Sequence, residues 1–212
     1  MLKSRKRAAK KYSAIRAERY HRNRYGDLRG RINRTFIWNA LVRSLASVPS
    51  GSRVLDVPCG TGQFCWDLAA AGYSVTGMDV SSAMLDVAAR QGSPEDVTLR
   101  QGDIFNLPFD NKSFDAAICI RFTNLVSARW RISAIRELTR VARVVVISYS
   151  HRYSLKYVSR WLRYVLKLRH KLSPRHDRES LNRELALAGV KLRDLILVAP
   201  LLSESWLAVL ES

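Results

Sequence analysis

The sequence predicts an α/β fold: a doubly wound, Rossmann-like sheet of seven strands with helices on both faces. Short apolar segments alternate with amphipathic segments over the middle of the chain, a pattern typical of βαβ units and a parallel sheet. The last two strand-like segments, 191–198 and 203–210, are joined by a link too short for a parallel crossover. The sheet is therefore expected to be parallel with an antiparallel C-terminal hairpin.

The elements follow from apolar spacing and from residues that end helices. Five segments are expected to be the parallel strands, namely 53–57, 74–78, 97–100, 115–120 and 143–149. Helical spacing predicts helices over 36–47, 62–71, 82–90, 129–141 and 177–188. Gly72, Gly92 and Gly189 lie where these helices should end.

Positive charge is concentrated at the two sides of a nearly neutral middle. Residues 1–34 hold 13 Lys and Arg against 2 acids, residues 35–150 hold 11 against 10, and residues 151–193 hold 12 against 3. We therefore divide the chain into a basic N-terminal helix and looser arm, 1–35, and a main domain, 36–212. Flanks of this kind are suited to an anionic surface or substrate.

Length and composition narrow the class of protein. With 212 residues, 47% of them hydrophobic, the chain should form one domain with an elaboration. No apolar run approaches the ~18–20 residues of a membrane span, and no secretory signal is visible, so a cytoplasmic location is expected. Three cysteines without a Cys-x-x-Cys spacing favour reduced thiols over a disulfide framework, and no metal site is expected.

Three acids end successive strands of the predicted sheet. Asp56 ends the first strand and precedes a turn with Gly60 and Gly62; Asp79 follows 23 residues later, and Asp103 ends the third strand. Carboxyl ends of parallel strands meet at one edge, where such folds bind ligands. The third glycine of the dinucleotide fingerprint and a P-loop are both missing. Three acids, with no basic residue within residues 54–64, favour a cationic ligand that lacks phosphates, such as a sulfonium nucleoside.

The same segments resemble a known family. Residues 54–62 resemble motif I of the class I S-adenosylmethionine-dependent methyltransferases, 75–83 their second motif, and 101–115 their third. Residues 116–122 resemble their fourth strand and its exit. The resemblance covers about residues 50–150 and is greatest to the small-molecule branch that includes ubiquinone/menaquinone C-methyltransferases. It implies S-adenosylmethionine as cofactor.

The resemblance also implies roles for individual residues. Asp56 and the Gly60–Gly62 loop would hold the methionine part, Asp79 the ribose hydroxyls, and Asp103 with Ile104 the adenine. The expected cofactor-binding set is Asp56, Pro58, Cys59, Gly60, Thr61, Gly62, Asp79, Val80, Met84, Asp103, Ile104 and Arg121. Two features depart from the family pattern: Pro58 replaces its first glycine, and its Pro-Gly-Gly before the fifth strand is absent.

Catalytic groups are less well marked than the cofactor site. Methyl transfer from a sulfonium is an in-line displacement that depends mainly on alignment, and a base is needed only if the acceptor holds its proton. His151, after the fifth strand, is the candidate base, with a surface histidine as the alternative. Tyr20, together with His21 and Tyr25, would reach the site if the arm folds back; aromatic packing on the core is the alternative. Residues 121–124 carry no amide-methylating signature.

Residues 152–172 are expected to form a basic amphipathic helix, in the place where the family often has a substrate lid. Three interpretations remain open: a lid packed on the core, an interfacial helix on anionic lipid, and a nucleic-acid face shared with residues 1–34. One face of this helix carries the basic stripe Lys156, Arg160, Arg163, Lys167 and Lys171.

These features together predict a methyltransferase for a small or lipid-linked acceptor, acting at the inner, anionic face of the membrane as a peripheral protein. Residues 147–150 followed by a basic helix resemble, more weakly, small methyltransferases of envelope glycolipids. The alternatives are an RNA methyltransferase and a non-catalytic S-adenosylmethionine-binding module whose basic flanks bind a membrane or partner. The sequence leaves the oligomeric state open.

Overall fold

A computed structural model describes most of the chain. It covers residues 14–92, 95–151, 161, 164–166, 176–199 and 203–211. The expected basic stripe from Lys156 to Lys171 lies outside these residues.

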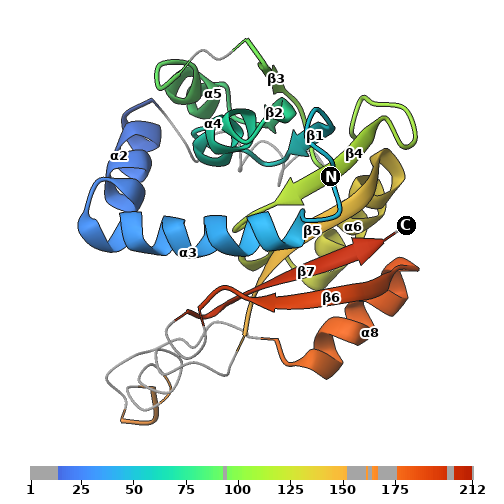
Figure 1. Ribbon diagram of the computed structural model, residues 1–212. Coiled ribbons are helices and arrows are strands. Elements are labelled where there is room, and N and C mark those ends of the chain that lie inside the picture. The colour runs from blue at the N-terminus through green and yellow to red at the C-terminus, as the bar shows by residue number, and fades with distance from the viewer. Residues whose placement is uncertain are drawn as a thin grey trace.

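Seven strands form one sheet in the order β3-β2-β1-β4-β5-β7-β6 (Figure 1). Strands β1 to β5 pair in parallel, and β7 runs antiparallel to β5 and β6. Their bounds are Arg53–Asp56, Ser74–Asp79, Val97–Gln101, Phe114–Cys119, Ala142–Ser150, Lys191–Leu197 and Ser205–Glu211 for β1 to β7. The predicted sheet is confirmed, with each strand end within two residues of its expected position.

The helices between the strands also lie where the apolar spacing predicts them. They are α4 (Gln63–Ala70), α5 (Ser82–Ala89), α6 (Ala128–Val141) and α8 (Arg178–Ala188), with a short 3-10 helix η1 (Thr123–Leu125) after β4. Side chains cap two of them: the Ser81 hydroxyl accepts from the Met84 amide at α5, and Asp177 forms a capping box with Ser180 at α8.

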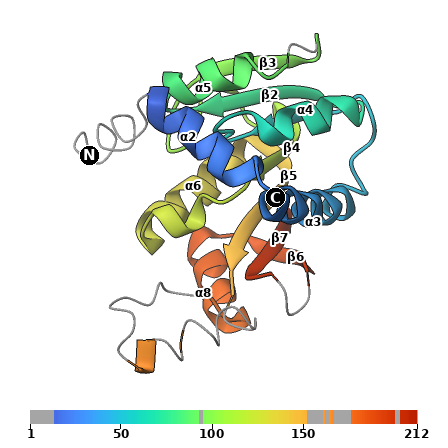
Figure 2. The same ribbon diagram turned by 90° about the vertical axis from the view of Figure 1, so that its left-hand side faces the viewer.

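The core lies on both faces of the sheet because successive strand residues point to opposite sides. On one face, α3 and α4 cover a cluster that includes Val54, Ala116 and Val146. On the other, α6 and α8 cover a cluster that includes Leu55 and Ala117. The two views in Figures 1 and 2 show this three-layer arrangement.

The N-terminal region contains two helices, α2 (Ala14–Tyr25) and α3 (Leu28–Ser44). The expectation of a looser arm up to residue 35 is wrong for this part of the chain. Asp27 caps α3 by accepting a hydrogen bond from the Gly30 amide at 2.7 Å, so the helix begins at Leu28. Helix α3 packs on the sheet through Ile37 and Leu41, whereas α2 turns away and packs against α5 (Figure 2).

Four residues of the expected basic helix are described, and all are exposed: Trp161 at 49%, Tyr164 at 46%, Val165 at 53% and Leu166 at 57%. None of the helices in the described ranges combines the length and apolarity that a bilayer crossing requires.

Candidate functional site

The turn after β1 leaves backbone open to a ligand. Gly60 and Gly62 have φ values of 57° and 72°, in the left-handed region that favours glycine. A Cβ on Gly62 would lie 2.9 Å from the Ala88 Cβ, so this position is closed by the approach of the turn to α5. A Cβ on Gly60 would meet nothing within 4 Å. The Gly60 side of the turn is therefore the open side, at the N-terminus of α4.

Asp79 joins this turn to the end of β2. One carboxylate oxygen accepts from the Gly60 amide and the other from the Ser81 amide, both at 2.9 Å. Asp79 is buried, and burial raises the pKa of its carboxyl above the ordinary value, against the effect of these hydrogen bonds. Its remaining lone pairs can accept from hydroxyl groups of a ligand.

Asp56 ends β1 beneath the same turn and is 2% exposed. Burial raises the pKa of its carboxyl to about 7, a hydrogen bond from the Cys65 thiol at 3.3 Å opposes this shift, and the nearby Asp79 charge adds to it. A carboxylate so poorly solvated gains from an approaching cation, because the pair then offsets the desolvation penalty.

The end of β3 brings the third acid to this edge. One Asp103 carboxylate oxygen accepts from the Phe105 amide at 3.0 Å, and the Gly102 amide donates to the Asp79 carbonyl at 3.0 Å. Ile104 is buried at 6% and belongs to the core cluster under α6. The structure thus brings Asp56, Asp79 and Asp103 to neighbouring strand ends, as their positions in the sequence predict.

Arg121 begins a turn that follows β4, at the point where strand order reverses. Its φ is 63°, and its amide donates to the Ser148 hydroxyl at 2.6 Å. Two further bonds fix the turn to β5: the Thr123 hydroxyl donates to the Ser148 carbonyl and the Asn124 amide group to the Ser150 hydroxyl, each at 2.7 Å. Sequence reasoning did not predict these tethers, because they require the β4–β5 pairing.

Helix α2 covers the other side of the turn. His21 Nδ1 lies 3.1 Å from the Thr61 hydroxyl and 3.1 Å from the Gln91 side-chain amide. Burial lowers the pKa of His21, which favours the neutral ring in this contact. Tyr20 packs instead on the small cluster of α2 and α5 that contains Met84. The arm therefore folds back, and His21 contacts the turn.

His151 lies just beyond β5 and is not a surface residue. It is 1% exposed and its ring stacks on Trp206, with centroids 4.8 Å apart. Its amide donates to the Glu204 carbonyl at 2.8 Å. Tyr20 lies on α2, which packs against α5, the helix that follows β2. His151 instead follows β5. Because β1 and β4 separate β2 from β5 in the sheet, the two candidate catalytic residues lie on opposite sides of the switch point. Within the described ranges, no three His, Cys, Asp or Glu residues form a potential metal site.

A family model described as a methyltransferase domain matches residues 54–144. A demethylmenaquinone methyltransferase of Staphylococcus epidermidis is 40% identical over 109 residues, which are 50% of this chain and 44% of that protein. One of Tropheryma whipplei is 35% identical over 137 residues, or 61% of this chain and 56% of that protein. The chain thus spans about half the length of these relatives.

Solved structures agree on the fold. The magnesium protoporphyrin IX methyltransferase from Synechocystis PCC 6803, crystallised with bound SAH, superposes with a TM-score of 0.75 at 18% identity, covering 99% of this chain and 98% of that one. A SAM-dependent methyltransferase from Aquifex aeolicus has a TM-score of 0.66 at 14% identity, covering 94% and 98%. Sheet order, motifs and family match agree: this chain carries a class I S-adenosylmethionine-dependent methyltransferase domain, whose cofactor is S-adenosylmethionine.

Proposed function

We propose that this protein transfers the methyl group of S-adenosylmethionine to a small, quinone-like or lipid-linked acceptor. The observation that carries the proposal is the convergence of Asp56, Asp79 and the open Gly60 backbone at one edge of the sheet. The relatives named demethylmenaquinone methyltransferases, which match about half of their length, support the acceptor class.

Each part of the cofactor has a proposed partner. Asp56 and the turn Pro58–Gly62 hold the methionine part, whose cationic groups compensate the buried carboxylate. Asp79, followed by Val80 and Met84, holds the ribose, and Asp103 with Ile104 frames the adenine. Arg121 lies at the exit of β4, beside the cofactor. No basic side chain lies in residues 54–64, which suits a ligand that lacks phosphates.

Catalysis is proposed to rest mainly on alignment of the acceptor with the methyl group, which can supply roughly 7–11 kcal/mol. The acceptor's electron pair forms the new bond to carbon while the carbon–sulfur pair returns to sulfur. Where the acceptor carries a proton, His151 is the proposed base and passes it on to water. Tyr20 is the proposed second contact, on the α2 side of the site.

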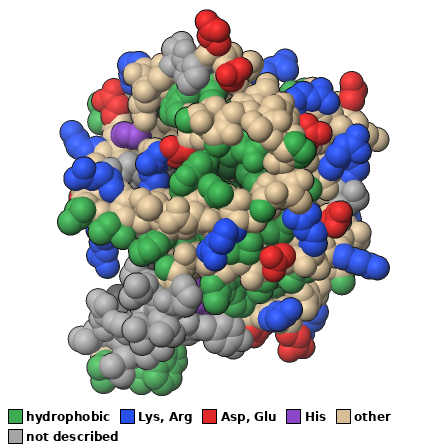
Figure 3. Space-filling model, in the orientation of Figure 1, with side chains coloured by type: hydrophobic (Ala, Val, Ile, Leu, Met, Phe, Trp, Pro, Cys, Tyr) green, Lys and Arg blue, Asp and Glu red, His purple; other side chains and the backbone are tan. Residues whose placement is uncertain are grey.

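The lipid-linked part of the proposal rests on surface character. Residues 161 and 164–166 expose apolar side chains within a stretch whose sequence is strongly basic. In Figure 3 hydrophobic atoms emerge at the lower left, where Figure 1 places this segment. An anionic membrane face complements both properties, since apolar groups enter the interface and Lys and Arg meet the headgroups.

Transfer of labelled methyl groups tests the function. The purified protein is incubated with labelled S-adenosylmethionine and, separately, demethylmenaquinone, a bacterial lipid extract, total RNA and a small-molecule extract. We expect label in the quinone or lipid fraction and its loss, with cofactor binding, in Asp79→Ala. Label in RNA alone would favour an RNA methyltransferase. Cofactor binding without label in any fraction would favour a binding module.

A further inference from the structure

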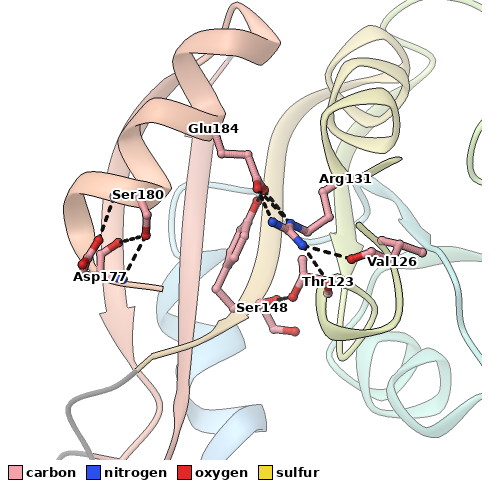
Figure 4. Close-up of polar contacts among 8 residues, drawn as sticks. Thr123, Val126, Arg131, Ser148, Asp177, Ser180 and Glu184 are labelled. Atoms are coloured by element: carbon pink, nitrogen blue, oxygen red, sulfur yellow. Dashed lines mark hydrogen bonds and ion pairs between the residues drawn. The ribbon is translucent and has the colours of Figure 1, made fainter. Parts of the chain in front are cut away.

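A buried ionic network lies beside the turn after β4. The Arg131 guanidinium, on α6, donates from Nε to both carboxylate oxygens of Glu184 on α8, at 2.9 Å each. The Tyr149 hydroxyl donates to the same carboxylate at 2.8 Å. Arg131 and Glu184 side chains are only 14% and 6% exposed. Figure 4 shows the guanidinium between Glu184 and the turn.

The other side of the guanidinium holds the turn. Arg131 Nη1 donates to the Val126 carbonyl at 3.0 Å and reaches the Thr123 carbonyl at 3.5 Å (Figure 4). Thr123 is the first residue of η1 and Val126 follows its last residue. Within this turn the Leu125 amide donates to the Phe122 carbonyl at 2.9 Å. A planar guanidinium can make both sets of bonds at once, whereas an ammonium group lacks this fixed fork.

The turn is thus held from two directions. The β5 residues Ser148 and Ser150 fix its first half through Arg121, Thr123 and Asn124. Arg131 fixes its second half through backbone carbonyls, with Glu184 fixing Arg131. The turn stands at the carboxyl edge of the sheet between β4 and β5, on the side away from the three acids. In the function proposed above, this is the side from which the acceptor approaches.

We propose that Arg131 is a positioning residue that sets the turn 121–126 as the acceptor-side wall of the site, with Glu184 and Tyr149 orienting its guanidinium. The link between Arg131 and the acceptor rests on the proposed function. The contact of Arg131 with the turn does not depend on that function. A buried ion pair is by itself a weak source of stability, because the desolvation of both ions opposes their attraction. Stability alone therefore does not account for Arg131 and Glu184 at these buried positions, whereas holding the turn in place does.

Three variants separate positioning from stability. Arg131→Met with Glu184→Gln removes both charges, keeps an oxygen for the Tyr149 hydroxyl, and leaves the turn without its donor. Glu184→Gln alone removes the charge pair but keeps Arg131 and its bonds to the turn. Arg131→Lys keeps the positive charge but lacks the planar set of N–H donors. It takes the place of the double variant in the test if that variant fails to fold. Glu179→Gln is the matched control, since its pair with Arg183 on the same helix is exposed.

Amide hydrogen exchange, followed by NMR, gives the direct readout. In the double variant and in Arg131→Lys we expect the Leu125 amide to exchange at least about tenfold faster, with Val145 at the centre of β5 unchanged. Glu184→Gln should show a smaller change and Glu179→Gln none. A Leu125 rate within about twofold of wild type in a folded double variant overturns the proposal.

Steady-state kinetics give the functional readout. With the acceptor fraction that takes up label, the acceptor KM should rise about tenfold in the double variant while the S-adenosylmethionine KM stays within about twofold. Equal changes in both constants would mark a merely structural role and overturn the proposal. If the wild type labels no fraction, the proposed function fails, and hydrogen exchange still decides whether Arg131 holds the turn.

Discussion

At the residue scale, burial of Asp56 links protonation to both stability and binding. Because burial raises the pKa of Asp56 from its ordinary value of 3.8 to about 7, the folded chain keeps a proton that the unfolded chain releases between these values. The unfolded state then binds fewer protons at this residue, so the contribution of Asp56 to stability falls as pH rises through this window and is constant above it. Bound S-adenosylmethionine supplies a cation, so it should offset the free-energy cost of ionising the buried Asp56 carboxyl.

We therefore expect Asp56→Asn to raise the stability of the ligand-free protein above pH 7 by about 1–3 kcal/mol, and to remove the part of the pH dependence in this window that Asp56 causes. Wild-type affinity for S-adenosylmethionine should rise up to about pH 7 and level off, whereas the variant should bind weakly throughout. Thermal unfolding and calorimetric titration across the window measure both effects. Wild-type affinity that falls as pH rises to 7 would contradict the proposed role.

The two glycines of the turn should respond differently to alanine. Gly62→Ala adds a Cβ at 2.9 Å from Ala88 on a left-handed backbone, so we expect a loss of about 1–3 kcal/mol in unfolding free energy. Gly60→Ala has room but fills the open side, so it should weaken cofactor binding more than stability. Gly51→Ala, also left-handed with nothing within 4 Å, is the control for backbone strain. Equal binding losses at Gly60 and Gly51 would argue against a ligand there.

At the element scale, α2 lies against the turn after β1, which is the proposed cofactor turn. Its contacts are His21 with Thr61 and Gln91, the Glu18–Arg90 ion pair at 3.0 Å, and Ala17 buried against α5. The ion pair is exposed and contributes little. His21 is therefore a polar contact between α2 and the turn itself.

We expect His21→Ala to raise the dissociation rate of S-adenosylmethionine by roughly three- to tenfold, in line with loss of a hydrogen bond of about 1 kcal/mol. The exposed Asn23→Ala on the same helix is the control. Stopped-flow displacement of the bound cofactor measures the rate. An unchanged rate in His21→Ala would mean that α2 packs on α5 without covering the cofactor.

At the same scale, the strands and the helices between them could be predicted because their apolar periods are intact. The start of α3 could not. Charged residues from Arg29 to Arg34 obscure the apolar spacing of its first turns, where Leu28 and Ile32 are exposed. The Asp27 cap fixes the start of the helix at Leu28, and this single-residue signal is weaker than the apolar period that marks the rest of the helix.

At the scale of the whole molecule, a net charge of +18 gives the protein a field that attracts any polyanion. Specific membrane binding should depend on where the charge lies. We expect Lys156, Arg160 and Arg163 changed together to Glu to reduce binding to anionic vesicles by tenfold or more, since each basic residue contributes about 1 kcal/mol near such a surface.

Vesicle flotation with phosphatidylglycerol-containing and neutral vesicles measures this binding. The matched control changes the exposed Arg53, Arg129 and Arg143 to Glu, which alters the net charge equally. An equal loss in both variants would assign the binding to the overall field. Wild-type protein that fails to float with anionic vesicles would remove the membrane part of the proposed function.

The sequence by itself determined the fold class, the cofactor and the three strand-end acids, because strand and helix periods and the Gly60–Gly62 turn are local features repeated at βα spacing. Only the tertiary structure decided which side chains meet across the sheet. His21 against Thr61, Arg131 against Glu184 and Ser148 against Arg121 join residues 27 to 53 positions apart. Such pairs depend on strand order and helix packing, and no local pattern encodes them.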